Sequence, residues 1–247
     1  MNRILLCGAM GSMGREVTHY ASDFGFEIAA GIDFNMTEEG GFPLYAGFSS
    51  FIREKADIII DFSRPAALPG LLEYAVPRKL PCVLASTGYG DAEQRLIEAA
   101  AKEIPLFVSA NMSVGVYVLK KLIRDAQQLM PQADIEIIEK HHRRKEDAPS
   151  GTATALLQAL TNEDTRVVYG RQGLDTKRRV GEIGVHSVRG GTLCGEHEVD
   201  FLMENEVISI THSAQNRGIF ANGALRAARF LLTKPAGLYG MDDVLEG

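Results

Sequence analysis

Tryptophan is absent and cysteine is scarce in this chain of 247 residues. The three cysteines, Cys7, Cys82 and Cys194, lie far apart, so they lack the close spacing of metal ligands. An odd number of isolated thiols suits a reducing compartment. We therefore expect a cytoplasmic protein in which the cysteines are small, partly buried hydrophobic residues.

Long apolar runs are also lacking. No run approaches the roughly 20 residues that cross a bilayer, and the apolar run in the N-terminal stretch MNRILLCG is too short for a signal peptide. These absences predict a protein without a membrane partner. With 45% hydrophobic and 23% charged residues, the composition is that of a globular protein with one large or two medium domains.

Basic residues are outnumbered by acidic ones. There are 26 Lys and Arg against 32 Asp and Glu, which gives a formal net charge of -6. Because binding to a nucleic-acid backbone needs a field of positive charge, this balance argues against nucleic acid as a partner.

The first half of the chain alternates short apolar runs with helical patterns. Apolar runs occur at 3–8, 27–33, 56–62, 81–86 and 104–110, and helical patterns at 13–24, 65–76 and 91–103, the last with Asp91 as its expected N-cap. Continuous apolar runs are typical of strands that are buried on both faces. Their alternation with helices predicts an α/β fold with a Rossmann-like, doubly wound parallel sheet.

A glycine-rich turn follows the first of these strands. The sequence GAMGSMG places Gly8, Gly11 and Gly14 between a strand and a helix, a variant of the dinucleotide-binding turn. Without side chains the backbone can approach a pyrophosphate, and the helix N-terminus favours the anion. Asp33 ends the second strand, where a carboxylate would bind the ribose 2′-hydroxyl. We therefore predict a nicotinamide dinucleotide site; the alternative is a glycine-rich turn without a ligand.

The residues around Asp33 also bear on the choice of cofactor. Its carboxylate would repel a 2′-phosphate, and the next residue, Phe34, provides no cation to neutralise one. We expect NADH to be preferred over NADPH, with Arg15 as the nearby cation that could weaken the preference.

Two later loops lie at the carboxyl ends of predicted strands, the edge where such sheets bind ligands. They are ASTGYG at 85–90 and SANMSVG at 109–115, and their small and amide side chains suit contacts to nicotinamide and ribose. Ordinary turn chemistry is the alternative for each loop.

The second half of the chain has a different period. A helix is expected at 116–130, followed by strands at 133–142, 181–191 and 196–214, the last two antiparallel with a turn near 204–205, and by a helix at 220–232. We expect residues 113–218 to form an inserted α+β domain on a mixed or antiparallel sheet. Residues 1–112 and 219–247 would form the dinucleotide-binding domain, and the linkers would lie at 111–115 and 216–223.

The segment EKHHRRKEDAPSGTA, residues 139–153, is the most unusual part of the chain. It places His141 and His142 at the end of a strand, then a charged loop with Lys145, then a helix start with Ser150 or Thr152 as N-cap. Histidine and lysine transfer protons, and a helix N-terminus attracts anions. The segment therefore predicts a site for a small molecule that carries carboxylates.

The alternatives for this segment are a nucleic-acid patch, a metal site and a solvated basic loop. A nucleic-acid patch is disfavoured because residues 139–147 contain four basic and three acidic residues and no aromatic residue. A metal site is disfavoured because adjacent strand residues point to opposite faces, so His141 and His142 cannot share one ion. Glu139 and His141 share a face of the strand, but a third ligand is not evident. A solvated basic loop is the plainest alternative. The opposite faces also predict that one histidine meets the reacting carbon, whereas the other meets a carboxylate or packs.

Together these residues resemble the 4-hydroxy-tetrahydrodipicolinate reductase (dihydrodipicolinate reductase) family of bacterial lysine biosynthesis. The resemblance covers essentially the whole chain and rests on the motifs GAMGSMGRE, DFSRP, ASTGY, ANMSVGV, EKHHRRKEDAPSGTA, GEHEVDF and FANGALRAARFL. It implies that NADH or NADPH reduces a small cyclic dicarboxylate to tetrahydrodipicolinate. It also implies a homotetramer assembled through the sheet of the second, substrate-binding domain. The residues alone predict a two-domain nicotinamide oxidoreductase for a small anionic substrate, with domains that close over it.

The resemblance further implies roles for individual residues. His141 matches the proton donor or acceptor and Lys145 the proton donor, whereas His142, Gly151 and Thr152 match substrate-binding positions. No metal is implied. The dinucleotide contacts match Gly8, Ala9, Met10, Gly11, Ser12, Met13, Asp33, Ala85, Ser86, Thr87, Ser109, Ala110, Asn111 and Met112.

Three departures from the usual motifs of the family are mild. ASTG stands where GTTG is usual and SANM where AANF is usual, but those contacts are largely made by the backbone. Phe34 stands where many members have arginine, which supports NADH. Two alternatives stay open. A sister dehydrogenase on the same scaffold would not explain HHxxK followed by PSGT, and a non-catalytic NADH sensor would need no paired histidine and lysine.

Overall fold

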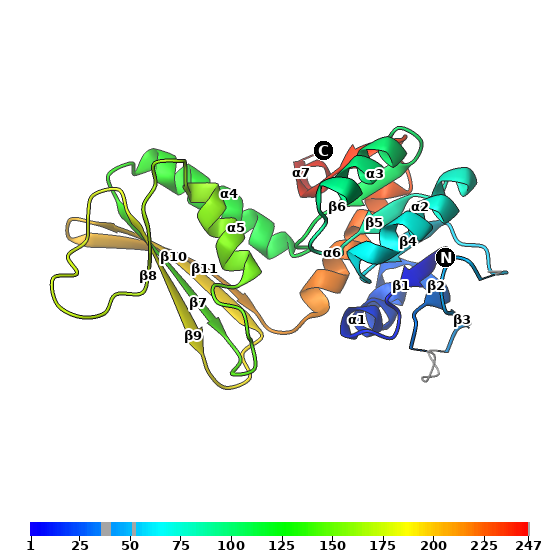
Figure 1. The fold of residues 1–247 in the computed structure, drawn as a ribbon, viewed down its shortest axis with the longest axis horizontal. Helices are drawn as coiled ribbons and strands as arrows, with labels where there is room; N and C mark the ends of the chain where they lie inside the picture. Colours follow the sequence, from blue (N-terminus) through cyan, green and yellow to red (C-terminus); the bar gives the residue numbers. More distant parts are fainter. Residues whose placement is uncertain (36–40, 51–52, 247) are drawn as a thin grey trace. The chain divides into compact units, whose positions relative to one another are not determined.

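The chain consists of two units, each with its own sheet and core (Figure 1). A computed structural model of the protein describes residues 1–35, 41–50 and 53–246. The first unit comprises Met1–Ser113 and Arg217–Gly247, and the second comprises Val114–Asn216. These boundaries lie one residue after and two residues before those expected from the sequence.

The first unit is built on a parallel sheet. Its strands are β1 (Asn2–Cys7), β2 (Phe26–Ile32), β3 (Leu44–Tyr45), β4 (Ile58–Asp61), β5 (Cys82–Leu84), β6 (Pro105–Val108) and β12 (Gly237–Tyr239). Across the described residues the strand order is β12-β6-β5-β4-β1-β2-β3, and each pairing is parallel. The chain order reverses between β1 and β4, the point at which such sheets bind ligands. The predicted Rossmann-like sheet is confirmed.

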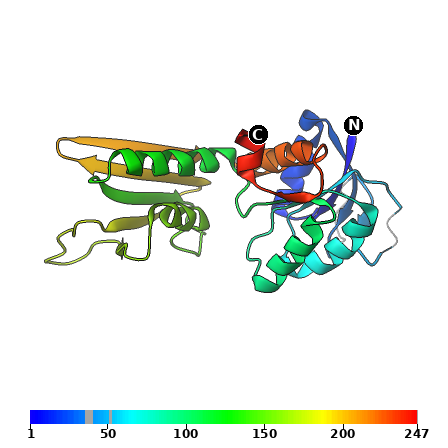
Figure 2. The same cartoon turned by 90° about the horizontal axis from the view of Figure 1, so that it is seen from above.

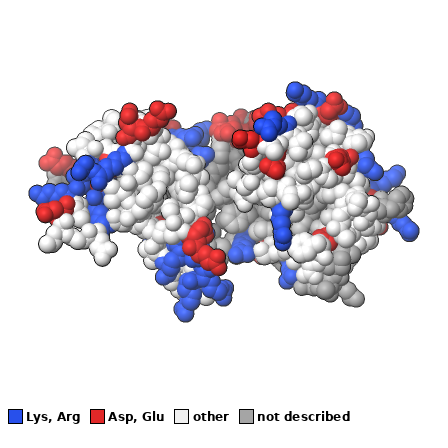
Figure 3. All heavy atoms as spheres, in the orientation of Figure 1, with Lys and Arg blue, Asp and Glu red and all other residues white. Residues whose placement is uncertain are grey.

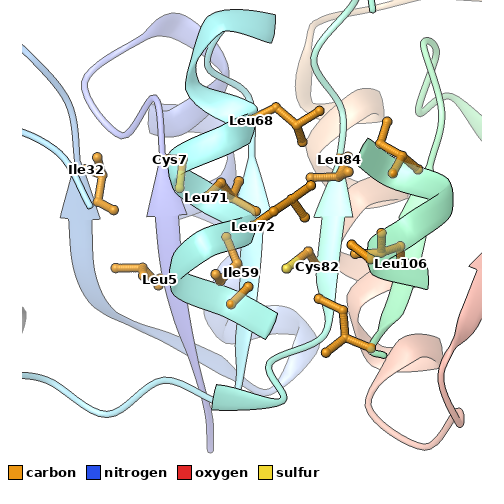
Figure 4. Close-up of a cluster of buried hydrophobic side chains, with 14 of the residues drawn as sticks. Leu5, Cys7, Ile32, Ile59, Leu68, Leu71, Leu72, Cys82, Leu84 and Leu106 are labelled. Atoms are coloured by element: carbon orange, nitrogen blue, oxygen red, sulfur yellow. The ribbon is translucent and has the colours of Figure 1, made fainter. Parts of the chain in front are cut away.

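Helices pack on both faces of this sheet. They are α1 (Ser12–Tyr20), α2 (Leu68–Ala75), α3 (Asp91–Ala101), α6 (Gly218–Leu231) and α7 (Met241–Glu246), with short 3-10 turns η1 (Ala21–Phe24), η2 (Pro65–Ala67) and η3 (Val76–Arg78). On one face, Leu68 and Leu71 of α2 pack with Leu5 and Ile59 of the sheet (Figure 4). On the other face, α6 contacts β4, β5, β6 and α1. Burial on both faces explains why the strands read as continuous apolar runs.

Two details of the first unit differ from the sequence-based expectations. The N-cap of α3 is Gly90, and Asp91 is the first helical residue. The Glu93 carboxylate accepts a hydrogen bond from the Gly90 N–H at 2.9 Å. Glu93, the third residue of the helix, therefore caps the N-terminus in place of Asp91. The expected linker at 216–223 is also wrong, because α6 already begins at Gly218.

The second unit has a mixed sheet. Its strands are β7 (Asp134–His141), β8 (Val167–Tyr169), β9 (Ile183–Arg189), β10 (Gly195–Met203) and β11 (Glu206–Ala214), in the order β11-β10-β7-β9-β8. The β10–β11 pair is antiparallel with its turn at 204–205, as predicted. The prediction that 181–191 is antiparallel is wrong, because β9 runs parallel to β7 and β8. Alternation in a sequence fixes the face of a strand but not the direction of its partner.

The helices α4 (Val114–Leu129) and α5 (Gly151–Leu160) pack on one face of the second sheet. Figure 2 shows α4 running along the β10–β11 hairpin, which it contacts. In β7 every second residue is buried, so Ile135 and Ile137 join this core. The same alternation turns Glu139 and His141 to the buried face. The position of the predicted catalytic histidine therefore follows from the period of the strand.

Two observations concern the surface and the helices. Figure 3 shows Lys and Arg interspersed with Asp and Glu over the visible face of each unit. Among the helices of the described chain, none is long and apolar enough to cross a membrane.

The contact between α6 and the 109–113 loop generates a stability prediction. A Cβ at Gly223 would lie 1.7 Å from the Met112 carbonyl oxygen, so Gly223→Ala forces the helix and the loop apart. We expect the free energy of unfolding, measured with a chemical denaturant, to fall by about 1–3 kcal/mol or more. Gly70→Ala is the matched control, because its Cβ would meet only Phe48 at 4.0 Å. Equal effects of the two substitutions would contradict the prediction.

Candidate active site

The glycine turn after β1 is shaped by close approaches of the backbone. Gly8 has a φ of 72°, and a Cβ there would lie 2.7 Å from the Phe62 carbonyl oxygen. A Cβ at Gly14 would lie 2.3 Å from the Gly8 carbonyl oxygen, so α1 can pack on the turn only without a side chain here. The N-cap of α1 is Gly11, and its first turn has neither a side-chain cap nor an acidic residue. The first-turn amides of α1 are therefore suited to an anion.

Asp33 directly follows β2, and its carboxylate holds the glycine turn in place. Oδ2 accepts a hydrogen bond from the Met10 N–H at 2.9 Å, and Oδ1 accepts one from the Asn35 N–H at 3.0 Å. Each carboxylate oxygen has further acceptor capacity, so the group can also accept a hydrogen bond from a ribose hydroxyl. Asp33 thus has a structural role that the sequence did not reveal.

A cleft of about 1120 Å³ lies beside this turn in the first unit. Its lining includes the predicted residues Gly8, Met10, Gly11 and Asp33. Ala9 is buried, and Ser12 and Met13 open α1. A cleft of this volume slightly exceeds the usual range for small-molecule sites, which fits a molecule as large as a dinucleotide.

Arg64 and Arg78, for which no local pattern in the sequence indicated a function, also line this cleft. The Arg64 guanidinium carbon lies 4.8 Å from the centroid of the Phe34 ring, and that of Arg78 lies 4.0 Å from the Tyr74 ring. The expectation that Phe34 has no cation beside it is therefore corrected. Arg15, the cation considered from the sequence, donates a hydrogen bond to the Met10 carbonyl oxygen at 3.0 Å.

The loop after β5 is tied to a buried carboxylate at the end of β4. Asp61 accepts hydrogen bonds from the Ser86 hydroxyl at 2.9 Å and from the Ser63 N–H at 3.0 Å, and the Tyr89 hydroxyl lies 3.4 Å away. Burial raises the pKa of Asp61, although these hydrogen bonds oppose the shift. Of the three predicted cofactor contacts in this loop, Ala85 and Ser86 are buried and Thr87 is exposed.

The loop after β6 is held by its own polar groups. The Ser109 hydroxyl donates to the Asn111 carbonyl oxygen at 2.7 Å, and the Asn111 side-chain oxygen accepts from the Ser113 N–H at 2.9 Å. Met112 is buried and Ala110 is exposed. Within the described residues, neither 85–87 nor 109–112 lines the cleft beside the glycine turn. The structure therefore places the predicted cofactor residues in one unit but not around a single cavity.

In the second unit, His141 ends the buried face of β7 and is 8% exposed. Its Nδ1 lies 2.5 Å from the Glu139 Oε2, and its ring meets the His197 ring edge to face at 5.1 Å between centroids. Burial lowers the pKa of His141, and the Glu139 carboxylate partly offsets this shift. A neutral imidazole at working pH can accept a proton.

Glu139 is a fully buried carboxylate that binds an arginine at two points. Arg189 on β9 donates from Nη1 to Oε2 at 2.8 Å and from Nη2 to Oε1 at 2.7 Å. Burial alone would raise the pKa of Glu139, but hydrogen bonds, first among them those of Arg189, lower it to about 2. The alternation of residues 133–142 in the sequence predicted that Glu139 and His141 lie on one face of the strand. Arg189 gave no such signal, because its contact spans 50 residues.

Ser150 links the start of α5 to β7 and β10. As N-cap of α5 it accepts a hydrogen bond from the Ala153 N–H at 3.1 Å, which confirms one of the two predicted caps. Its own N–H donates to the Glu139 Oε1 at 3.1 Å, and its hydroxyl lies 3.0 Å from the His197 Nε2. Burial lowers the pKa of His197 to about 4. No local pattern in the sequence indicated a role for His197, although it lies in the family motif GEHEVDF.

The remaining predicted residues surround this cluster. Lys145 Nζ lies 2.7 Å from an oxygen of Asp147 in the loop before α5. Gly151 and Thr152 form the first turn of α5. His142 lies beyond the end of β7, where its N–H donates to the Leu193 carbonyl oxygen at 2.9 Å. Side chains of the described residues form no group of three or more His, Cys, Asp or Glu placed to hold a metal ion.

These features define the class of the protein. A glycine turn at the switch point of a parallel sheet, with an acid after the second strand, fits a nicotinamide dinucleotide. A buried histidine, a lysine and a helix N-terminus in the other unit fit proton transfer to an anionic molecule. Together they define a two-unit nicotinamide-dependent oxidoreductase.

The chain belongs to the dihydrodipicolinate reductase family. Residues 2–112 match the model "Dihydrodipicolinate reductase, N-terminus", and residues 115–245 match "Dihydrodipicolinate reductase, C-terminus". Members of this family use a nicotinamide cofactor. The resemblance inferred from the sequence motifs is confirmed.

Individual relatives are similar over their full length. The 4-hydroxy-tetrahydrodipicolinate reductase of Caldanaerobacter subterraneus subsp. tengcongensis is 46% identical, with 100% of this chain and 99% of that protein covered. The enzyme of the same name from Clostridium tetani is 45% identical, with 99% and 97% covered. A solved structure of dipicolinate-bound dihydrodipicolinate reductase from Paenisporosarcina sp. TG-14 has a TM-score of 0.78 at 23% identity and covers 99% of both chains, which shows the same fold.

The burial of His197 predicts a dependence of stability on pH. The folded state lowers the pKa of His197 from 6.5 to about 4, so the unfolded chain takes up the proton first as the pH falls. The contribution of neutral His197 to stability is therefore complete above about pH 6.5 and is lost between there and about pH 4. We expect His197→Gln to reduce this loss of stability by about 1–3 kcal/mol.

The test compares free energies of unfolding at pH 7 and pH 4.5. Burial lowers the pKa of His141 and of His212 as well, so the difference between the variant and the parent protein is what is measured. His19→Gln, at an exposed position in α1, is the control. An unchanged pH dependence in His197→Gln would contradict the assignment.

Proposed function

We propose that the chain reduces 4-hydroxy-tetrahydrodipicolinate to tetrahydrodipicolinate with NADH or NADPH, in lysine and diaminopimelate biosynthesis. The observation that carries the proposal is the cluster of His141, Glu139 and Ser150 at the start of α5, in a chain that matches the family over both units. Full-length relatives carry the name of this reductase. The Paenisporosarcina neighbour binds dipicolinate, which supports a small cyclic dicarboxylate as the substrate.

The second unit would bind the substrate and move its proton. His141 would donate or accept the proton, and Lys145 would donate one. His142 and the backbone of Gly151 and Thr152 would hold a substrate carboxylate. The helix N-terminus at α5 supports the last role, since its dipole stabilises an anion by about 0.3–1 kcal/mol or more.

The first unit would hold the dinucleotide, which supplies the hydride. The turn from Gly8 to Met13 would lie against the pyrophosphate and Asp33 against the ribose. The residues 85–87 and 109–112 would meet the nicotinamide half. The absence of a side-chain cap on α1 supports the pyrophosphate position.

We expect NADH to be the better cofactor. The Asp33 carboxylate next to the ribose disfavours a 2′-phosphate. Arg64 on the Phe34 ring is the cation best placed to compensate, since both residues line the same cleft. The two effects oppose each other, so NADPH should also be accepted.

A cytoplasmic location and a homotetramer built through the second sheet are part of the same proposal. The face of that sheet opposite α4 and α5 carries Val188, Leu202 and Val207, which are 47%, 37% and 54% exposed. Exposed apolar side chains on a sheet face suit a protein interface.

An absorbance assay tests the reaction directly. The preceding synthase would generate the substrate in place from pyruvate and aspartate semialdehyde, and oxidation of NADH or NADPH would be followed. We expect oxidation that depends on the synthase. Folded protein that binds NADH without turnover would instead support a sensor or a sister dehydrogenase.

The His141→Ala variant belongs in the same assay. Loss of a proton-transfer group lowers kcat by roughly 10²- to 10⁴-fold, and we expect a much smaller rise in KM. A change in KM alone would make His141 a binding residue.

The cofactor preference is tested by the ratio of kcat/KM for NADH to that for NADPH. We expect a ratio above one in the parent protein. Arg64→Ala should lower kcat/KM for NADPH by roughly tenfold, as for loss of one charged hydrogen bond, with little change for NADH. Arg78→Ala, which lines the same cleft, is the control and should leave the ratio unchanged. A clear preference for NADPH would refute the proposed preference.

A further inference from the structure

Glu139 uses both carboxylate oxygens in contacts with three different residues. Oε2 lies 2.5 Å from the His141 Nδ1 and accepts a hydrogen bond from the Arg189 Nη1 at 2.8 Å. Oε1 accepts from the Arg189 Nη2 at 2.7 Å and from the Ser150 N–H at 3.1 Å. The side chain is fully buried, so it has no access to water.

The pairing with Arg189 decides the chemical form of Glu139. A carboxylate that faces a guanidinium at two points is ionised, and an ionised carboxylate only accepts hydrogen bonds. The proton between Glu139 and His141 therefore belongs to Nδ1 of the imidazole. In the neutral ring, Nε2 is then the nitrogen without a proton.

Arg189 is itself held by the backbone around the site. Its Nη1 donates to the Val188 carbonyl oxygen at 2.8 Å, and its Nη2 donates to the Asp147 carbonyl oxygen at 2.7 Å. Arg189 is also the register partner of His141 on the parallel strand β9. The arginine therefore joins β7, β9 and the loop before α5, and it cannot leave Glu139 without losing these contacts.

Space is kept next to the other ring nitrogen of His141. A Cβ at Gly195 on β10 would lie 2.9 Å from Nε2, so only glycine leaves this side of the ring uncrowded. Across the described part of the chain, Nε2 has no hydrogen-bond partner. The charged and titratable groups that face the ring are Glu139, Arg189 of β9, His197 of β10 and Lys145 of the loop between β7 and α5.

We infer that Glu139, clamped by Arg189, is a positioning residue that fixes His141 with its proton on Nδ1 and presents Nε2 as the atom that takes up or gives up a proton. The inference deepens the proposed function and rests on it only for the identity of the molecule that exchanges the proton. The ring keeps its Nδ1 proton throughout, while Nε2 alternates between its protonated and unprotonated forms.

A second cluster of the same composition lies on β7, β9 and the loop before β9, and it provides a matched control. Glu136 of β7 pairs with Arg178, and its Oε2 lies 2.7 Å from the Nε2 of His186 on β9. By the alternation of β7, Glu136 lies on the sheet face opposite Glu139. Glu136→Gln therefore removes a similar carboxylate from the same unit without touching His141.

The first test is nuclear magnetic resonance of the imidazole nitrogens in the parent protein, labelled with ¹⁵N-histidine. We expect neutral His141 to carry its proton on Nδ1, and His186 to show the opposite pattern as an internal reference. Neutral His141 with its proton on Nε2 would overturn the inference. Because this measurement needs no substrate and no variant, its failure is distinguishable from a failure of the proposed reaction.

The second test is the pH profile of kcat and KM for Glu139→Gln. Loss of the negative charge beside the ring moves the limb of the profile that His141 contributes to lower pH. We expect kcat to fall at least about tenfold, but by less than the roughly 10²- to 10⁴-fold of losing the proton-transfer group, and KM to change by less than about threefold. Glu136→Gln should leave that limb in place. An unmoved limb with unchanged kcat in Glu139→Gln would overturn the inference.

Discussion

The burial of one carboxylate organises the second unit. An ion removed from water costs several kcal/mol unless it is paired and its remaining lone pairs are used. Glu139 meets this requirement with Arg189 from β9, the Ser150 N–H from the start of α5 and His141 from its own strand. Each partner belongs to a different part of the unit. The constraint therefore fixes the end of β9 and the N-terminus of α5 against the last residues of β7, which is where the proposed chemistry lies.

The first unit contains a second buried carboxylate with the opposite behaviour. Asp61 is as buried as Glu139, but its partners are hydroxyl and amide groups with no positive charge. Burial consequently raises the pKa of Asp61, whereas the guanidinium lowers that of Glu139 to about 2. Asp61 has a structural role, because it hydrogen-bonds to the loops after β4 and β5. Glu139 suits a permanent negative charge beside His141, the proposed proton-transfer group.

Local patterns in the sequence predicted the elements and one face of the site, but they did not predict its long-range contacts. The apolar runs gave the parallel strands, and the glycine spacing gave the turn at Gly8. The alternation of β7 put Glu139 and His141 on one face. The pairing of β9 parallel to β7 was not predictable, because alternation carries no strand direction. The contacts of Arg189 and Arg64 were also not predictable, because each arginine meets its partner across about 30 to 50 residues of chain.

The two proposed proton-transfer groups are held in different ways, and the difference suits a charged substrate. His141 depends on a buried ion pair, and breaking such a pair costs about 3–5 kcal/mol. Lys145 meets Asp147, whose side chain is 60% exposed, and an exposed ion pair contributes only about 0–1 kcal/mol. In the proposed reaction, a substrate carboxylate would therefore replace Asp147 as the partner of Lys145 at little cost, whereas Glu139 would stay beside His141. The fold fixes the orientation of the histidine and would leave the lysine able to change its partner.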